Sequence, residues 1–370
     1  MIFATHKDPL LKALDRISSI VKANPRTVDI LQTVLVDSYG GDVYLTATSP
    51  MANAKVEVKG AKVGTSGAFV VNYDKLRDRV SKSGDTMRLE ADETTLKIIS
   101  SDDQRLGIPL NDIREFPGIT WEFPEESYGM QSEDLIALLR TANSLTSSVT
   151  SLTPAFLQVM IKDRQLWAAN NVSYHKIPIS CNPSLESRIP TATLTSIVKF
   201  IQDSGGDQVW LSHINESHVV ITSGADQFQA TPISAPFPDL TELFKQTAVR
   251  ATSDLKVDRK RLVSELTKAK TSADTYGRVT ITIPDTALTS MVVETQSEGG
   301  DWYEGTVPGC LWTGAAGRNL VFNIDTLLSY LRSFSGEELV LQVGDDFKGD
   351  LTPLMCKEGE HVGIINQFRI

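Results

Sequence analysis

The sequence has few cysteines and no long apolar run. Its 3 cysteines, Cys181, Cys310 and Cys356, are too scattered for a disulfide framework or a zinc cluster, which favours a reducing, cytoplasmic compartment. No apolar run approaches the roughly 18 residues of a membrane-spanning helix, and the first residues lack the apolar core of a signal peptide. We therefore expect a soluble, intracellular protein without a membrane partner.

Basic residues are also in the minority. The chain has 36 Lys and Arg against 46 Asp and Glu, a formal net charge of −10. Taken as an average, this balance argues against a nucleic-acid partner, because phosphate binding is mainly electrostatic. The average does not say where on the molecule the charges lie.

Motifs of catalysis and metal binding are missing as well. The sequence has no phosphate-binding loop, dinucleotide fingerprint, zinc-protease motif or nucleophile elbow. His213 and His218 are the only histidine pair close enough to suggest a metal site, and their alternating context favours a surface turn. Asp102-Asp103 and Asp345-Asp346 lie in turn-like contexts, so a hydrolase built on Asp345-Asp346 is a remote alternative. We expect no cofactor, no metal and no enzymatic activity.

What the sequence does contain is a repeat. At about 100–200 residues per domain, 370 residues predict two to four domains. One pattern occurs three times: an amphipathic helix, strands, a strand that runs into a second amphipathic helix, and further strands. The apolar stripes of the first helices are Leu11, Leu14, Ile17 and Val21; Leu135, Leu138, Ala142 and Leu145; and Leu262, Leu266 and Ala269. The second helices carry Leu76 and Val80; Leu194, Val198 and Ile201; and Leu327, Leu328 and Leu331.

A glycine and an acidic residue follow each second helix. The pairs are Gly84-Asp85, Gly206-Asp207 and Gly336-Glu337, and we expect each glycine to end its helix at positive φ. The repeat is far longer than the roughly 20–50 residues of a solenoid unit, so it predicts copies of a whole α+β domain. The expected domains are residues 1–122, 128–248 and 255–370, separated by polar segments.

Positive charge gathers on three of the expected helices. Residues 1–26, 72–82 and 256–270 carry net charges of +3, +2 and +4, which leaves −19 on the rest of the chain. Lys12 and Arg16 are four residues apart and should share a polar face opposite the apolar stripe. Ordinary solvated faces and a phosphate-facing surface explain this pattern about equally well. The candidate phosphate-contacting cations on these three helices are Lys12, Arg16, Lys22, Lys82 and Lys268, and the near-neutral helices add Arg140 and Lys199.

Several stretches of the chain, in their order and spacing, resemble the bacterial sliding clamp, the beta subunit of DNA polymerase III. They are Val43–Thr48, Arg105–Ile119, Phe237-Pro238-Asp239, Phe322-Asn323 and the C-terminal Phe368-Arg369-Ile370. The resemblance covers the whole chain. It implies three tandem clamp domains, each with two helices on an antiparallel sheet. It also implies a head-to-tail homodimeric ring with helices lining the hole around duplex DNA.

The function implied by this resemblance is that of a non-enzymatic processivity factor. A topological link to duplex DNA needs only weak, sequence-independent phosphate contacts. DNA polymerase and clamp loader would dock through short peptides that contain Gln and Leu or Phe. The alternative is a clamp-like docking platform or spare clamp with altered partners. Among the family's DNA-contacting positions, Arg26 matches one, and the polar loop with Ser148 is its counterpart in the second domain.

The resemblance also implies a partner-peptide groove between the second and third domains. The chain departs from the family there, in the loop Asn170–His175 and in the tail Asn366–Ile370. Phe156 and Tyr276 are alternatively core residues at a domain junction. The matching positions are Phe156, Asn170, Val172, Ser173, Tyr174, His175, Pro238, Leu243, Tyr276, Asn323, Thr326, Leu351, Pro353, Ile364, Ile365, Asn366, Gln367, Phe368, Arg369 and Ile370.

The subunit interface implied by the resemblance joins the first domain of one copy to the third domain of another. Leu106 and Ile108 match an apolar edge strand, and Lys75 and Arg105 match its basic contacts. Complementary charges would fix the head-to-tail pairing. The third domain offers Glu294, Glu298, Asp301 and Glu304, and Trp302 and Trp312 either cover the joint or fill a local core.

Overall fold

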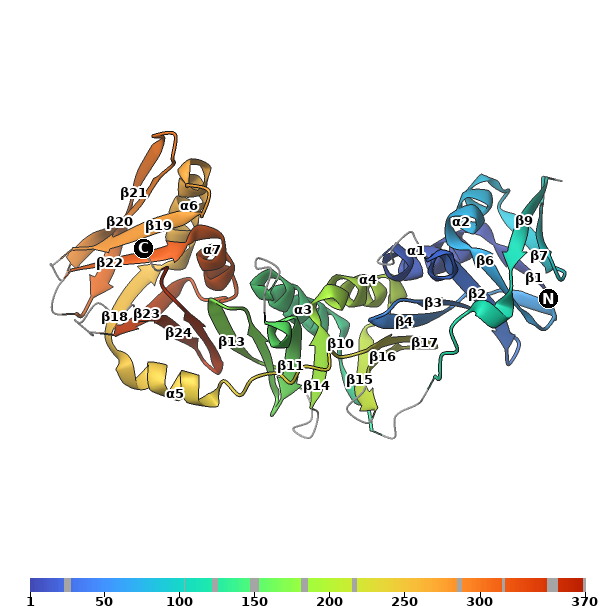
Figure 1. The fold of residues 1–370 in the computed structure, drawn as a ribbon, viewed down its shortest axis with the longest axis horizontal. Helices are drawn as coiled ribbons and strands as arrows, with labels where there is room; N and C mark the ends of the chain where they lie inside the picture. Colours follow the sequence, from blue (N-terminus) through green and yellow to red (C-terminus); the bar gives the residue numbers. More distant parts are fainter. Residues whose placement is uncertain are drawn as a thin grey trace. The chain divides into compact units, whose positions relative to one another are not determined.

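The structure is a computed structural model of the 370-residue chain. It describes residues 1–22, 28–102, 104–121, 126–146, 153–180, 186–214, 218–284, 288–314, 317–344 and 352–368, with backbone alone at 213–214 and 288–289. Two compact units are formed by residues 1–140 with 185–232, and by residues 141–184 with 233–370 (Figure 1). Among the described residues, no helix is long and apolar enough to cross a membrane.

The first unit is built on one antiparallel sheet of 13 strands. Its helices α1 (Lys7–Lys22), α2 (Tyr73–Lys82) and α4 (Leu194–Ser204) lie on one side of that sheet, with α1 in contact with both of the others (Figure 1). In sheet order the strands are β10 (Tyr128–Gln131), β15 (Gln208–Ile214), β16 (His218–Ser223), β17 (Asp226–Ala230), β4 (Ala52–Glu57), β3 (Asp42–Thr48), β2 (Thr33–Tyr39), β6 (Ala68–Asn72), β9 (Arg105–Asn111), β8 (Thr95–Ser100), β7 (Thr86–Ala91), β1 (Ile2–His6) and β5 (Lys62–Thr65). The short strand β14 (Ser187–Pro190) also belongs to this unit.

The second unit is built on a second antiparallel sheet, covered by α6 (Arg259–Ala269) and α7 (Ile324–Arg332). Its strand order is β11 (Gln158–Lys162), β12 (Gln165–Ala169), β13 (Ser173–Pro178), β25 (His361–Ile365), β24 (Leu354–Glu358), β23 (Glu338–Gly344), β18 (Ala251–Asp258), β21 (Trp302–Trp312), β20 (Leu288–Gln296), β19 (Arg278–Ile283) and β22 (Arg318–Asn323). Its core combines the apolar faces of these strands with those of α6 and α7, including the fully buried Leu266, Leu327 and Phe322. Helix α3 (Ser132–Thr146) runs from the first unit into the second.

The six predicted helices are all present, and their local chemistry explains where they begin. The side chains of Asn72, Asp258 and Asn323 each accept a hydrogen bond from the N–H three residues later, which caps α2, α6 and α7. The predicted stripes are buried, except that α3 buries Leu139 fully in place of Leu138 and α1 buries Leu10 in place of Leu11.

The three glycine–acid turns hold equivalent places in the fold. Each turn's acidic residue accepts a backbone hydrogen bond from the first residue of the preceding first helix. The three bonds are Lys7 N to Asp85 O (2.9 Å), Ser132 N to Asp207 O (2.9 Å) and Arg259 N to Glu337 O (2.8 Å). A donor that the helix itself leaves unsatisfied is therefore paired in the same way three times.

The reason for glycine at these turns differs from the prediction. Gly84, Gly206 and Gly336 are not at positive φ. Of the three helices before these turns, only α4 ends in the left-handed conformation, at Gly205 with φ 66°. A Cβ at Gly84 would lie 2.9 Å from Ser101 Oγ, and one at Gly336 would lie 2.8 Å from Glu358 Oε1. A side chain at either turn would therefore have to displace a neighbouring polar side chain, which favours glycine there.

The polar segment expected between the second and third domains has a structure of its own. It forms α5 (Thr241–Arg250) and the beginning of β18. β18 pairs with β23 from Ala251 onward, so the expected domain start at residue 255 falls within a strand. Alternating burial along β18, rather than a continuous apolar run, gave this stretch its polar composition.

Candidate nucleic-acid and partner interfaces

Three of the predicted DNA-binding cations are exposed on the helices. Lys12 and Lys22 lie on α1, and Arg140 lies on α3. None of the three forms an ion pair with another described residue within 4.0 Å. These side chains are therefore available to a phosphate group in solvent.

Arg16 contradicts the prediction. Its side chain is 4% exposed, and its Nη1 lies 2.5 Å from Asp226 Oδ2 on β17. The spacing from Lys12 predicted a shared polar face, but α1 packs against both α2 and α4, so its buried surface extends around to Arg16. A buried guanidinium already paired with a carboxylate cannot reach DNA, and Arg16 leaves the candidate set.

The other described cations are engaged within the chain. Lys82 Nζ lies 2.7 Å from Asp78, which lowers the pKa of that carboxyl. Lys268 Nζ lies 2.6 Å from Glu265, and Lys199 Nζ donates to Ser18 Oγ at 2.8 Å. Surface pairs of this kind are weak and exchange readily with solvent or phosphate. The predicted Arg26 and Ser148 lie outside the described residues.

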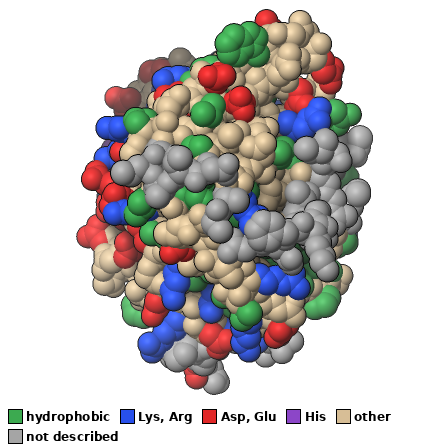
Figure 2. All heavy atoms as spheres, turned by 90° about the vertical axis from the view of Figure 1, so that its left-hand side faces the viewer, with side chains coloured by type: hydrophobic (Ala, Val, Ile, Leu, Met, Phe, Trp, Pro, Cys, Tyr) green, Lys and Arg blue, Asp and Glu red, His purple; other side chains and the backbone are tan. Residues whose placement is uncertain are grey.

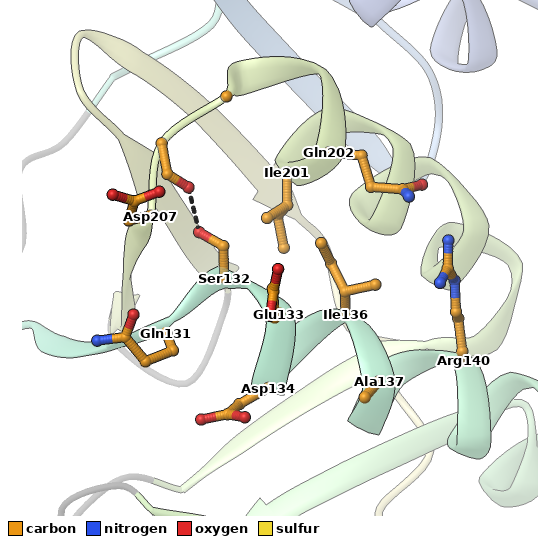
Figure 3. Close-up of a pocket in the computed structure, with 12 residues that line it drawn as sticks. Gln131, Ser132, Glu133, Asp134, Ile136, Ala137, Arg140, Ile201, Gln202 and Asp207 are labelled. Carbon is orange, nitrogen blue, oxygen red and sulfur yellow. Dashed lines mark hydrogen bonds between the residues drawn. The ribbon is translucent and has the colours of Figure 1, made fainter.

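A polar pocket of about 870 Å³ lies between the start of α3 and the end of α4 (Figure 3). Ile201 of α4 lies above Ser132 and Ile136 of α3, and Ser132 Oγ donates to Gly206 O at 2.6 Å. Three acidic residues line this pocket with a single arginine: Glu133, Asp134, Asp207 and Arg140. That excess of carboxylates opposes an anionic ligand, so the pocket itself does not suit a phosphate.

An apolar cluster in the second unit occupies the region of the predicted peptide groove. Its buried members are Trp167, Ala169, Phe237 and Leu240, and its partly buried members are Phe156, Met160, Tyr174, Leu243 and Phe244. The ring centroids of Phe156 and Tyr174 lie 6.1 Å apart, and those of Trp167 and Phe244 lie 5.8 Å apart, both edge to face. Partly buried aromatic side chains on a buried base are the composition that anchors apolar peptide side chains. We call these nine residues the apolar cluster.

Several predicted groove residues are instead interior residues. His175, Ile364 and Ile365 are each 0% exposed, so their side chains cannot contact a peptide directly. Because side chains alternate along the paired strands β13 and β25, His175 and Ile365 face the core, whereas Ile364 lies on the opposite face, across from Tyr174, and is fully covered there. Asn170, Ser173 and Thr326 are likewise buried, at 1%, 1% and 4% exposure.

Asn170 has a structural role that its burial explains. Its Nδ2 donates to Leu145 O at 2.7 Å, and its Oδ1 accepts from the N–H groups of Val172 and Ser173 at 2.8 and 2.7 Å. The amide therefore shapes the loop before β13, which carries the exposed part of the predicted site. Val172 lies in this loop and Tyr174 follows it on β13, and both are partly buried.

The remaining predicted groove residues are at least partly accessible where the structure describes them. Tyr276 is 62% exposed. The C-terminal segment is held by hydrogen bonds from Asn366 N to Val172 O at 2.8 Å and from Phe368 N to Val321 O at 2.7 Å. Pro238, Leu243, Asn323, Pro353, Asn366, Gln367 and Phe368 are partly buried, whereas Leu351, Arg369 and Ile370 lie outside the described residues.

Two strands have an incompletely paired edge. β9 pairs with β8 over Arg105–Pro109 but with β6 only at Leu110 and Asn111. β21 pairs with β20 over most of its length but with β18 only at Leu311 and Trp312. Among the described residues, one edge of residues 105–109 and one edge of residues 302–310 have no ladder partner, which makes both available to another strand.

The side chains at these edges match the predicted interface only in part. Lys75, Arg105, Glu298, Asp301 and Glu304 are exposed, and Leu106 is partly buried. Ile108 is 1% exposed, so the prediction that it offers apolar surface is wrong, because its side chain already packs inside the fold. Trp302 is 70% exposed and Trp312 is 3% exposed, so only Trp312 fills a core. On the face seen in Figure 2, acidic, basic and hydrophobic side chains are interspersed.

Comparison with known proteins decides which fold this is. Residues 1–120 match the family described as DNA polymerase III beta subunit, N-terminal domain. The structure superposes on the DNA polymerase III subunit beta from Pseudomonas aeruginosa with a TM-score of 0.86, at 15% identity and over 100% of both chains. The chain has the sliding-clamp fold.

Two further clamp structures are equally similar. A putative DNA polymerase III beta subunit from Eubacterium rectale gives a TM-score of 0.87, and the DNA polymerase sliding clamp from Bacillus subtilis gives 0.86. Each is 17% identical and covers 100% of this chain and 99% of its own. No curated protein sequence matches the chain. The predicted clamp fold is confirmed, and the dimeric ring remains a prediction.

Within this clamp fold, the predicted groove residues include only Phe156, Tyr174 and Leu243 of the apolar cluster and miss its other six members, of which three are instructive. Trp167 lies on β12, where its neighbours gave no functional signal, and Lys176 Nζ lies 5.2 Å from its ring centroid. Phe244 lies on α5, in a segment expected to be a polar connection. The third is Met160 on β11. In the described parts of the chain, no group of three or more His, Cys, Asp or Glu side chains is arranged to hold a metal ion.

Proposed function

We propose that this protein is a DNA sliding clamp, a non-enzymatic ring that holds duplex DNA topologically and tethers a replicative polymerase to it. The observation that supports this most strongly is the clamp fold over the full length of the chain, with TM-scores of 0.86 and 0.87 against clamp structures. Fold similarity alone does not carry function, so the proposal also depends on the surfaces described above.

The open strand edges support assembly of two copies into a ring. Pairing of residues 105–109 of one copy with residues 302–310 of another would satisfy both unpaired ladders. The exposed cations Lys75 and Arg105 would then meet the exposed acids Glu298, Asp301 and Glu304. Because the two edges differ, the contact is head to tail, and two such contacts close a ring.

The exposed helix cations support a weak, sequence-independent contact with DNA. Lys12, Lys22 and Arg140 extend long side chains from the helical side, in a chain whose net charge is −10. Contacts of this kind go to phosphates and carry no base recognition, which permits movement along the duplex. A topological link does not need them to be strong.

The apolar cluster supports docking of polymerase and loader peptides. Phe156, Tyr174 and Leu243 keep part of their surface exposed over the buried Trp167. A peptide with an aliphatic or aromatic side chain would bury that surface, and aromatic anchors of this kind carry most of the energy of such interfaces. The partner set is therefore duplex DNA, a second copy, and proteins with short apolar motifs.

The test is the length of DNA that the cognate polymerase makes on a singly primed circle in the presence of its clamp loader. Addition of the protein should lengthen the products per binding event, and Tyr174→Ala should remove most of that gain. Tyr39→Ala is the matched control, because Tyr39 is 75% exposed on β2 and is not a member of the apolar cluster. Product length that does not depend on the protein would contradict the proposal.

A further inference from the structure

A buried carboxylate joins the first and second repeats. Asp226 begins β17 and is 3% exposed. Its Oδ1 accepts a hydrogen bond from Glu57 N on β4 at 2.7 Å, and its Oδ2 lies 2.5 Å from Arg16 Nη1 on α1. One side chain of the second repeat thus holds both a strand and a helix of the first.

The guanidinium at this junction also contacts the helix layer of the second repeat. The Cζ atom of Arg16 lies 5.1 Å from the ring centroid of Phe200 on α4. Beside it, Lys199 Nζ on α4 donates to Ser18 Oγ on α1 at 2.8 Å. The pair Arg16–Asp226 therefore lies where the sheet layer, through β4 and β17, and the helix layer, through α1 and α4, both pass from one repeat to the next.

Stability alone is a poor explanation of this pair. Arg16 is 4% exposed, and its Nε and Nη2 have no hydrogen-bond partner among the described residues. A buried ion pair with unsatisfied donors usually adds little to stability, and apolar side chains of similar volume often replace it without loss. Unlike apolar contact, an ion pair is directional, so it constrains the relative orientation of the elements that carry its two side chains.

The equivalent position at the next junction is built differently. His361 begins β25 just as Asp226 begins β17, and each strand pairs across its junction from the following residue onward. His361 stacks on Phe334 with ring centroids 4.2 Å apart, and it forms no ion pair within 4.0 Å with another described residue. Only the first junction uses opposite charges at this position.

We propose that Arg16 and Asp226 are positioning residues that fix the orientation of the first repeat on the second. The positioning role follows from the contacts above. Its consequence, that a fixed orientation of the two repeats allows the ring to close, rests on the proposed clamp function. Removal of the pair should leave both repeats folded but broaden the range of angles between them. Ring closure should weaken as a result. Once two copies have made one contact between residues 105–109 and residues 302–310, the remaining pair of edges would seldom be oriented to make the second.

The experiment measures the distance distribution between spin labels on cysteines introduced at Glu93 and Asp203, one in each repeat. Both positions are exposed, and the three native cysteines are replaced by alanine. The variants are the apolar pair Arg16→Met with Asp226→Leu, and Asp226→Asn, which retains the size of the side chain. Arg77→Met is the matched control, because Arg77 pairs with Asp15 at 2.9 Å on exposed surface within the first repeat.

In the variants at Arg16 and Asp226, the distance distribution should broaden or shift while the far-ultraviolet circular dichroism stays unchanged. The dimer dissociation constant should rise by about tenfold or more. Arg77→Met should alter neither quantity. A distribution as narrow as in the unaltered protein, in both the apolar pair and Asp226→Asn, would overturn the positioning role.

The two parts of the proposal fail separately. A broadened distribution with unchanged dimerisation supports the positioning role and overturns its consequence for ring closure. If the unaltered protein does not dimerise, the proposed clamp function fails, and the distance distribution of the monomer still decides whether Arg16 and Asp226 set the orientation.

Discussion

Mild acid should destabilise the protein through a buried pair of histidines in the second unit. His361 is 6% exposed and stacked on Phe334, and burial lowers its pKa to about 4, with only Glu358 acting in the opposite direction. His175 is 0% exposed, its ring centroid lies 5.9 Å from that of His361, and burial followed by repulsion from His361 lowers its pKa as well. Both rings are therefore neutral in the folded protein at pH values where an unfolded histidine is charged.

The sign and the size of the effect follow from these pKa values. Above the unfolded value of 6.5, both states are neutral and the stability is fully present. As the pH falls toward the folded value of about 4, the unfolded chain takes up protons that the folded chain excludes. For His361 alone, the free energy of unfolding should fall by about 2 kcal/mol between pH 8 and pH 5. His175 adds to the loss in the same direction.

The assay is urea denaturation at pH 8, 6.5 and 5, for the unaltered protein and for His361→Phe, which preserves an aromatic stack without a titrating group. The variant should lose about 2 kcal/mol less over this range. Carboxylates with a lowered pKa do not interfere, because Asp92 and Asp112 titrate near 2 in the folded state and near 3.8 unfolded. An equal fall in both proteins would refute the reasoning.

Three other predictions test the surfaces. Lys12→Glu and Lys22→Glu should each weaken DNA binding and reduce the slope of log affinity against log salt by about 1 or more, whereas binding through other surfaces would leave the slope unchanged. Trp302→Ala should raise the dimer dissociation constant about tenfold in light scattering and leave unfolding unchanged, because the side chain is 70% exposed. Trp312→Ala should instead lower the free energy of unfolding by about 3–5 kcal/mol, because that side chain is 3% exposed; a small loss would contradict its place in the core.

Sequence periodicity was sufficient for the helices and for the repeat. Residues such as Leu14, Leu76 and Leu266 recur at helical spacing because each helix buries one stripe on a sheet, and all three are buried in the structure. The glycine–acid turns were found from the sequence because the same backbone bond is made three times. The reason why glycine occupies these turns could not be predicted, because the side chains that approach Gly84 and Gly336 belong to residues distant in the sequence and leave no local signal.

The individual site residues were harder to predict because their roles depend on partners distant in the sequence. Arg16 has the spacing of a surface residue, and only its contact with Asp226, far along the chain, makes it a buried one. The sequence predicts His175 in a loop that resembles a peptide site, but His175 lies on β13, whose pairing with β25 turns its side chain inward. Phe244 joins the apolar cluster only because α5 forms where composition indicated a connection.

The account's central claim is a topological link to DNA, and retention on circular DNA tests it most directly. The protein is loaded by its clamp loader onto nicked circular duplex, separated from free protein at elevated salt, and followed before and after one restriction cut. The account predicts retention on the circle for many minutes and rapid loss after the cut, because a ring slides off a free end. Loss at the same rate from cut and uncut DNA would contradict it.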